Sequence, residues 1–283
     1  MIKYIKVLLL FSNIWAIGYQ GLVIPQNGEI LSNAGTGIAG NIDPVLNPAM
    51  QKIDVPYIQY SLNKWLGDLS GSYTLFRWGK TVQKQVSIQT WNANDIPLYG
   101  DSPSTYPIGQ FGVHWTSAAF SLSHHFNTPY IFGLRLQTSY SHLFTESLSA
   151  LTLDLGTFFP INNMLSIAGV MRNIGYEFNN NIKANLPLEY GLGINCEIPF
   201  LKSSLLSDIL YNKSNGEEKR LAFVTNWKIF NINVGKSIAE KRNANSLGFS
   251  FNYRRWKINY GVYFHENSTV LGMPRFLDVR CYL

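Results

Sequence analysis

The sequence predicts an all-β protein, a transmembrane antiparallel β-barrel of 14 strands with a short N-terminal plug or hatch segment. Apolar and polar residues alternate along most of the chain after Pro56, and the composition is rich in aromatic residues and poor in charged ones, at 14% each. No later stretch approaches the roughly 18 uninterrupted apolar residues that a membrane-spanning helix needs. A chain that enters a membrane without such a helix must form a closed barrel, because open sheet edges cannot be satisfied in lipid.

The first 18 residues have the pattern of a secretory signal peptide. A start that carries Lys3 and Lys6 precedes a short apolar run, and small residues follow at a cleavage spacing, after Ala16 or Gly18. A buried first strand or helix is the other interpretation, which the short and oddly flanked run disfavours. Together with a barrel, export predicts the outer membrane of a Gram-negative bacterium as the location.

Two regions follow the predicted signal peptide. Residues 19–55 are expected to form the plug or hatch segment, because most of this stretch is rich in Gly, Asn and Pro and lacks a clean period. Residues 56–283 are expected to form the barrel as a single unit, since large all-β barrels often have this length. About 12 to 15 two-faced segments lie in this region, and closure needs an even number, so we expect 14 strands.

The two-faced pattern is cleanest between Leu188 and Glu197. Apolar faces persist for about 9 to 11 residues, as a tilted strand needs to cross a bilayer, whereas strands of soluble sandwiches average roughly 5 to 6. A soluble, secreted β-sandwich is the alternative, and it predicts shorter strands. We expect a hairpin at Arg254–Arg255, and we expect the last segment, Arg275–Leu283, to pair with the first strand.

Tryptophans tend to lie at the ends of the segments and are therefore expected in aromatic girdles at the membrane surfaces. These residues are Trp65, Trp78, Trp91, Trp115, Trp227 and Trp256. The longest interruption of the strand pattern, from Asn92 to Pro107, is a candidate surface loop.

No motif predicts an enzyme. Gly35, Gly37 and Gly40 match a dinucleotide fingerprint, but Pro44 and Pro48 forbid the helix that this motif requires. The five histidines lack the spacing of a zinc site. The formal charge of +6 is dispersed along the chain, which argues against nucleic acid as a partner. We therefore expect no catalytic residue, no cofactor and no metal.

An acyl hydrolase of the outer membrane would need a histidine and a serine on the same face of the wall. His142 lies on an apolar face, but the next position on that face is Phe144, so the nucleophile is missing there. Asp154 lies on a polar face, and Arg135 on the previous strand is its expected cross-strand partner, as a lumen ion pair with a structural role.

Four short segments follow one another along the chain: Gly133–Ser141, Asp154–Phe159, Arg172–Gly175 and Leu186–Leu188. In this order they resemble the PorV/PorQ family of type IX secretion barrels. The stretch Asn47–Pro48–Ala49 looks like the motif found there and in the related FadL-type fatty-acid transporter barrels, and Trp65–Leu69 resembles PorQ-type members. Arg135 stands where the family usually has Lys, and the lead-in to Asn47 is shortened.

The resemblance implies a 14-stranded barrel that serves the type IX protein secretion system, closest to PorQ. Such a barrel would scaffold the surface-attachment complex for secreted cargo, with outer-membrane lipid and other attachment-complex proteins as partners. Candidate contacts for the plug or a partner are Asn47, Pro48, Ala49 and Asp68. The alternative function is a FadL-like transporter of hydrophobic solutes such as long-chain fatty acids, which would require an apolar pocket behind the hatch.

Overall fold

The structure is a computed structural model. It describes residues 18–40, 43–49, 51–99, 106–125, 129–144, 146–178, 185–213, 215–240, 242–265 and 268–283. The predicted signal peptide, residues 1–18, lies outside the described residues apart from Gly18.

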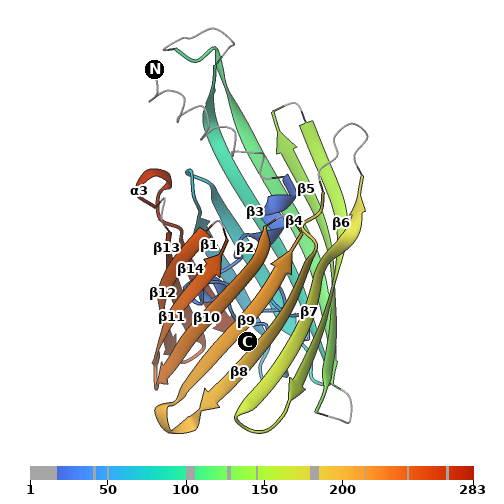
Figure 1. Cartoon of the computed structure of the whole chain (residues 1–283), viewed down its shortest axis with the longest axis vertical. Helices are drawn as coiled ribbons and strands as arrows, with labels where there is room; N and C mark the ends of the chain where they lie inside the picture. Colours follow the sequence, from blue (N-terminus) through green and yellow to red (C-terminus); the bar gives the residue numbers. More distant parts are fainter. Residues whose placement is uncertain are drawn as a thin grey trace.

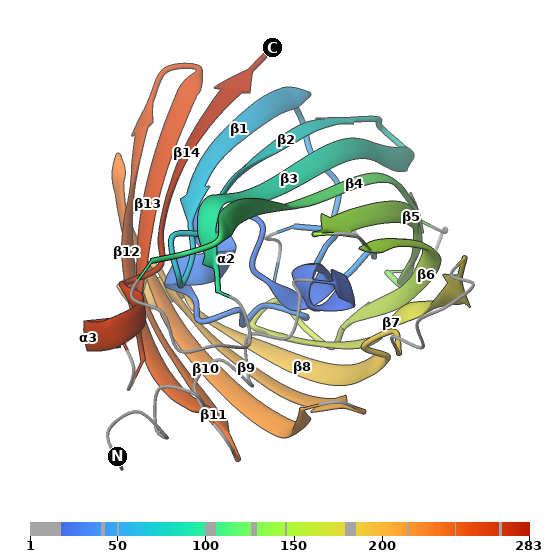
Figure 2. The ribbon, with the colours of Figure 1, turned by 90° about the horizontal axis from the view of Figure 1, so that it is seen from above.

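Fourteen antiparallel strands form one closed barrel, which confirms the predicted fold class (Figures 1 and 2). The strands are β1 (Tyr57–Lys64), β2 (Ser70–Trp78), β3 (Val82–Leu98), β4 (Gly109–His125), β5 (Ile131–Leu143), β6 (Glu146–Pro160), β7 (Leu165–Glu177), β8 (Glu189–Ile198), β9 (Ser203–Asn212), β10 (Gly216–Trp227), β11 (Phe230–Ala239), β12 (Arg242–Tyr253), β13 (Trp256–His265) and β14 (Arg275–Tyr282). As predicted, β14 closes the barrel against β1, from Tyr57 opposite Tyr282 to Lys64 opposite Arg275. The expected hairpin at Arg254–Arg255 joins β12 to β13.

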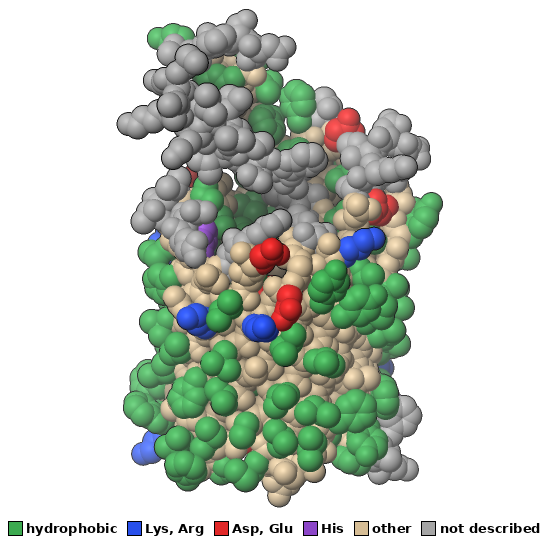
Figure 3. Space-filling view, in the orientation of Figure 1, with side chains coloured by type: hydrophobic (Ala, Val, Ile, Leu, Met, Phe, Trp, Pro, Cys, Tyr) green, Lys and Arg blue, Asp and Glu red, His purple; other side chains and the backbone are tan. Residues whose placement is uncertain are grey.

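Side chains along each strand alternate between the lumen and the outer wall, as the sequence pattern predicts. In β1, polar side chains such as Gln59 and Ser61 are buried inside the barrel, while Ile58, Tyr60 and Leu62 are exposed outside. Figure 3 shows hydrophobic side chains over the lower part of one outer face, with most charged groups in view gathered above them. A wide apolar belt on the outer wall is what lipid requires. Among the described residues, no helix is long and apolar enough to span a membrane.

The two rims of the barrel differ. Connections at the rim that holds Pro56 and the C-terminus are short, and we name it the short-turn rim. The three longest connections, 99–108, 178–188 and 266–274, lie at the opposite rim, which we name the long-loop rim; the last of them contains helix α3 (Ser268–Leu271). Barrels of the outer membrane have short periplasmic turns and longer extracellular loops. The short-turn rim is therefore assigned to the periplasmic side.

Strand β3 is longer than the sequence predicts. The expected loop from Asn92 to Pro107 is wrong in its first part, because β3 continues to Leu98 through a bulge between Ala93 and Ile96. Proline is tolerated in a strand edge that has no neighbour. Pro97 lies on such an edge, since pairing with β2 ends where Asn92 faces Ser70. The β3–β4 hairpin therefore projects beyond the rest of the wall (Figure 1).

The described residues of the N-terminal segment between 18 and 49 lie inside the barrel (Figure 2), whereas Lys52, Asp54 and Val55 are exposed. The segment contains the 3₁₀ helix η1 (Gly18–Val23) and the short helix α2 (Gly28–Ser32), whose N-cap is Asn27. The Asn27 side chain accepts a hydrogen bond from the Ile30 N–H at 2.9 Å, as an N-cap does. Helix α2 packs against β11 to β14.

Candidate functional site

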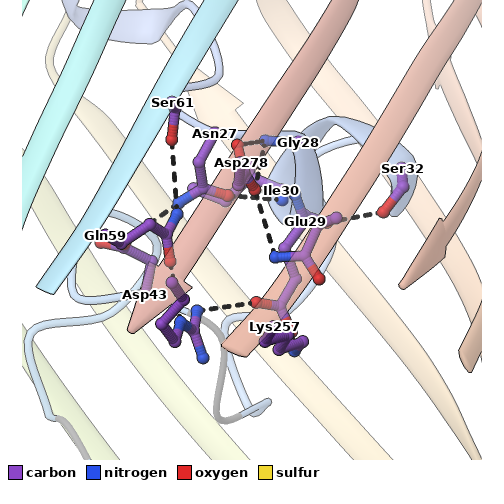
Figure 4. A network of polar contacts seen from close by, with 12 residues as sticks. Asn27, Gly28, Glu29, Ile30, Ser32, Asp43, Gln59, Ser61, Lys257 and Asp278 are labelled. Carbon is purple, nitrogen blue, oxygen red and sulfur yellow. Dashed lines mark hydrogen bonds and ion pairs between the residues drawn. The ribbon is translucent and has the colours of Figure 1, made fainter. Parts of the chain in front are cut away.

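The first turn of α2 binds the last strand. Asp278 of β14 accepts hydrogen bonds from the Gly28 N–H at 2.8 and 2.9 Å and from the Glu29 N–H at 3.2 Å (Figure 4). These N–H groups have no partner within a helix, and a carboxylate near a helix N-terminus is stabilised by them. Asp278 is fully buried. This contact therefore holds the N-terminal segment against the seam where β14 meets β1.

Glu29 adds an ion-pair cluster to the same region. Its carboxylate lies 2.9 Å from the Lys257 ammonium of β13 and 3.0 Å from the Arg280 guanidinium of β14. Burial alone would raise the pKa of Glu29, but Lys257 and Arg280 outweigh it and hold the pKa below its usual value. Glu29 is therefore a charged anchor of the segment at neutral pH.

The glycine-rich stretch that follows α2 binds a carboxylate of the wall. Asp208 of β9 accepts hydrogen bonds from the Gly37 N–H at 2.7 Å and from the Ile38 N–H at 3.1 Å. Consecutive N–H groups of a glycine-rich turn form a small anion site. The stretch whose glycines resemble a nucleotide motif thus has its anion supplied by the barrel itself.

Asp43 is a buried carboxylate of the segment on the opposite side of the lumen from Asp208. It accepts hydrogen bonds from the Asn27 amide at 3.0 Å, the Val45 N–H at 3.0 Å and the Tyr73 hydroxyl at 3.3 Å. Burial raises the pKa of Asp43, and this effect outweighs the hydrogen bond from Val45 and the charge of Arg135. Its ionised form is therefore disfavoured, unlike that of Glu29.

The predicted contact stretch Asn47–Pro48–Ala49 lies against two glycines of the wall. The Asn47 amide donates to the Ile38 carbonyl at 2.9 Å and to the Thr157 carbonyl at 3.1 Å. A Cβ at Gly133 would lie 2.0 Å from the Pro48 carbonyl, and one at Gly156 would lie 2.0 Å from the Asn47 side-chain oxygen. Glycine is needed at both positions, because any larger side chain would collide with the segment.

Asp68 does not join this group. It occupies the β1–β2 turn at the long-loop rim with a left-handed φ of 61°, and it is exposed. The stretch of Asn47 contacts β6 near the short-turn rim, so the structure does not bring the two together.

Arg135 and Asp154 face each other across β5 and β6 in the lumen. Their side chains lie 3.0 Å apart and are almost completely buried. Asp154 also accepts the Asn173 N–H at 2.7 Å. Two further ion pairs follow around the wall, Arg172 with Glu189 and Arg220 with Glu218.

A cavity of about 450 Å³ lies between these ion pairs and the N-terminal segment. The wall supplies its charged side. The segment supplies most of its apolar side, through Leu22, Ile24, Ile30, Val45 and Leu46. The cavity is therefore two-sided, with an apolar surface that belongs to the part of the chain inside the barrel.

An apolar cluster lies in the lumen toward the long-loop rim, and the sequence analysis missed it. Trp91 of β3 and Trp115 of β4 face each other there and are 0% and 1% exposed, so their predicted place in an outer girdle is wrong. Buried members of the cluster are Tyr19, Leu22, Leu31, Ala34, Leu69, Trp91, Trp115, Leu148, Ala150, Ala244, Tyr263 and Phe276. Trp65 packs against it rather than against lipid, whereas Trp227 and Trp256 are exposed on the outside as predicted.

A signal for this inward orientation was present in the sequence. Trp91 shares its strand face with Gln83, Gln85 and Gln89, which are buried in the lumen. Alternation along β3 therefore places Trp91 inside, and its position near an interruption of the pattern misled the assignment.

His142 has a hydroxyl partner that the sequence analysis did not find. Its Nδ1 lies 3.0 Å from the hydroxyl of Ser147, its cross-strand neighbour on β6. Within the described part of the chain, no carboxylate is hydrogen-bonded to His142, so the pair lacks the orienting group of a catalytic triad. Within the same residues, no group of three or more metal-ligating side chains is found.

Comparison with known proteins yields structural neighbours only. No family model and no curated protein matches the chain. The toluene transporter TodX of P. putida has a TM-score of 0.71 at 7% identity, with 91% of this chain and 98% of that chain covered. The monoaromatic hydrocarbon channel CymD has a TM-score of 0.65 at 10% identity, with coverage of 91% and 97%.

The toluene transporter TbuX of Ralstonia pickettii has a TM-score of 0.63 at 9% identity, with coverage of 91% and 98%. Identities this low show the fold alone. These neighbours are transporters and channels rather than enzymes. The chain therefore has the fold of the hydrocarbon-transporter barrels and spans almost their full length.

Proposed function

We propose that this protein is an outer-membrane transporter of small hydrophobic solutes, of the FadL-like type. The observation that carries the proposal is the apolar cluster around Trp91, Trp115 and Phe276, which packs against the N-terminal segment inside the barrel. A polar, water-filled lumen would suit a scaffold or a general pore. An apolar surface directly behind a hatch is what a carrier of apolar solutes requires.

The size of the cavity suits the same function. Small-molecule sites have volumes of about 300 to 1,000 Å³, and the cavity of about 450 Å³ lies at the lower end of this range. The cavity reaches the long-loop rim at Asn212 and Gly216, and it shares Leu22 and Tyr263 with the apolar cluster, so a solute that enters from this rim would meet both. The N-terminal segment occupies the lumen below, so passage requires this segment to shift.

An uptake measurement tests the proposal. Cells without a hydrocarbon transporter would produce the full-length protein, and uptake of radiolabelled toluene would be compared with cells that lack it. We expect faster, saturable uptake, and a severalfold decrease for Trp91→Phe with Trp115→Phe. The control variant, Trp227→Phe with Trp256→Phe, changes only outward residues and should keep the uptake rate. If the folded wild-type barrel gave no more uptake than cells without it, transport of this solute class would be wrong.

The scaffold function in the type IX secretion system remains a second candidate, and one observation favours it. The connection between β3 and β4 carries Tyr106 and Ile108, which are 80% and 70% exposed. Apolar side chains exposed to water often mark a protein interface. PorQ-like attachment to other secretion proteins would use such a surface.

Gentle detergent extraction of the tagged full-length protein tests this candidate. Recovery of attachment-complex proteins, and their loss with Tyr106→Ser and Ile108→Ser, would support it. A matched control is Tyr211→Ser with Ile209→Ser, which alters exposed residues on β9. If the barrel is extracted without partner proteins, and cells that produce it take up toluene, transport is left as the function.

A further inference from the structure

A continuous row of polar side chains crosses seven neighbouring strands on the outer face near the long-loop rim. The pairing register places its members side by side, from β14 through β1 to β6. They are Arg275, Lys64, Ser70, Asn92, His114, His142 and Ser147. Each is exposed or half-buried, whereas their chain neighbours such as Asn63, Trp91 and Phe276 face the lumen.

Hydrogen bonds link the row internally. The His114 Nδ1 and the Asn92 side-chain oxygen lie 2.8 Å apart, and the His142 Nδ1 and the Ser147 hydroxyl lie 3.0 Å apart. The Tyr140 hydroxyl lies 3.1 Å from the same Ser147 hydroxyl. The row is therefore an ordered set of donors and acceptors at the upper border of the apolar wall.

The row ends in two cations that face each other. Lys64 of β1 is directly opposite Arg275 of β14, and both side chains point outward. Like charges in directly opposite positions destabilise a sheet unless an anion lies between them. Neither cation forms an ion pair with a carboxylate of the described residues, and the nearby turn residue Asp68 is unpaired too. An anion bound between Lys64 and Arg275 would relieve this repulsion.

A groove of about 520 Å³ lies beside this cation pair. Its apolar lining comes from Tyr60, Leu62, Tyr260 and Leu277 on the membrane side of the row, and its polar lining includes Ser72 and Thr90. The Ser72 and Thr90 hydroxyls are hydrogen-bonded at 3.0 Å. The two hydroxyls thus lie in one row with Leu62 and Leu277, one step further from the rim than the cations.

We propose that this surface binds a phosphorylated glycolipid of the outer leaflet. Lys64 and Arg275 hold the phosphate, because two cations on neighbouring strands can both form strong charge-assisted hydrogen bonds with phosphate oxygens. Ser70, Asn92 and His114 then bind sugar hydroxyls, and an acyl chain lies in the groove over Leu62 and Leu277. The site is on the outside of the barrel, so it does not depend on the proposed transport through the lumen.

Native mass spectrometry of the full-length barrel tests this assignment. Delipidated protein in detergent would be titrated with lipid A, with the same lipid after removal of its phosphates, and with phosphatidylethanolamine. We expect lipid A to bind at least tenfold more tightly than either other lipid. Lys64→Gln with Arg275→Gln should weaken lipid A binding at least tenfold. The control, Lys84→Gln with Lys236→Gln, removes two other outward cations and should leave the affinity unchanged.

Three results would overturn the assignment. One is equal binding of lipid A before and after loss of its phosphates. Another is an affinity of the Lys64→Gln, Arg275→Gln variant that equals that of its control. The third is displacement of lipid A by millimolar inorganic phosphate, which would make the cation pair a site for free phosphate rather than for a lipid. Heat-dependent migration of each variant on a gel verifies that the barrel is folded.

Discussion

The Asp278 carboxylate of the last strand and the Gly28 N–H of the N-terminal segment are hydrogen-bonded at 2.8 and 2.9 Å, 250 residues apart in the chain. Both groups are buried. This contact closes the first turn of α2 and fixes the segment to the seam of the barrel. Substitution of Asp278 therefore tests directly whether this contact holds the segment in the lumen.

Asp278→Ala should loosen the N-terminal segment without opening the wall. The variant leaves buried N–H groups of Gly28 and Glu29 without an acceptor, which costs about 2 to 3 kcal/mol. We expect a higher single-channel conductance in planar bilayers, because the released segment unblocks the lumen. Asp68→Ala, in an exposed turn, is the control. Equal conductance of Asp278→Ala and wild type would show that this bond does not hold the segment.

Gly133→Ala should displace the stretch around Pro48. A Cβ at this position would lie 2.0 Å from the Pro48 carbonyl, which is backbone and cannot rotate away. Overpacking of this kind costs about 1 to 3 kcal/mol or more, so we expect a lower thermal midpoint in detergent and faster proteolysis near residue 48. Gly109→Ala, whose Cβ would meet nothing within 4 Å, is the matched control. A Gly133→Ala protein as stable as that control would contradict the close packing.

Docking of the segment should weaken in acid because of Glu29. The Lys257 and Arg280 charges hold the pKa of Glu29 below its unfolded value, so its contribution is complete above the unfolded pKa and is lost as the pH falls through the folded pKa. Thermal midpoints measured from pH 3 to pH 7 should therefore fall in acid, and Glu29→Gln should remove part of this slope.

Asp43 should have the opposite pH dependence. Burial raises its pKa, so its contribution is present below the unfolded pKa of about 4 and is lost as the pH rises through the folded pKa. In a plot of the thermal midpoint against pH, Asp43→Asn should therefore reduce the slope above about pH 4, the unfolded pKa. Glu29→Gln should leave the slope in that range unchanged. The same effect of both variants on the acid side would show that the sign for Asp43 is wrong.

The Arg135 and Asp154 pair should be more costly to break than to replace. Arg135→Gln leaves a buried carboxylate without its cation, which costs about 3 to 5 kcal/mol, whereas removal of both charges costs much less. We expect the double variant Arg135→Met, Asp154→Asn to unfold in denaturant at a higher midpoint than Arg135→Gln. The exposed pair Lys219 and Glu217 is the control, and loss of its ion pair should change the unfolding free energy by less than about 1 kcal/mol.

The sequence predicts the strands and their closure well, because alternation is a local property. Each face of β1 can be assigned from residues two positions apart. The same alternation identifies β14 as a wall strand, and its pairing with β1 follows from closure of the barrel. The register between strands then follows from hairpin turns such as Arg254–Arg255. The Arg135 and Asp154 contact lies one hairpin apart and belongs to the same class of short-range features.

Contacts between the N-terminal segment and the wall could not be predicted in this way. The Asp208 and Asp278 carboxylates meet N–H groups about 170 and 250 residues away, and no local pattern connects them. The need for glycine at positions 133 and 156 becomes apparent only when the N-terminal segment packs against them. A glycine on the lumen side of a strand fits a wet lumen as well as a close backbone contact, so the sequence leaves the choice open.

The position of Asp278 also constrains the order of assembly. The carboxylate belongs to β14, the strand that pairs with β1 to close the barrel. Its partner, Gly28, precedes every strand of the barrel. The contact requires β14 to be in place in the sheet, so the segment that fills the lumen is tied to a strand that completes the wall.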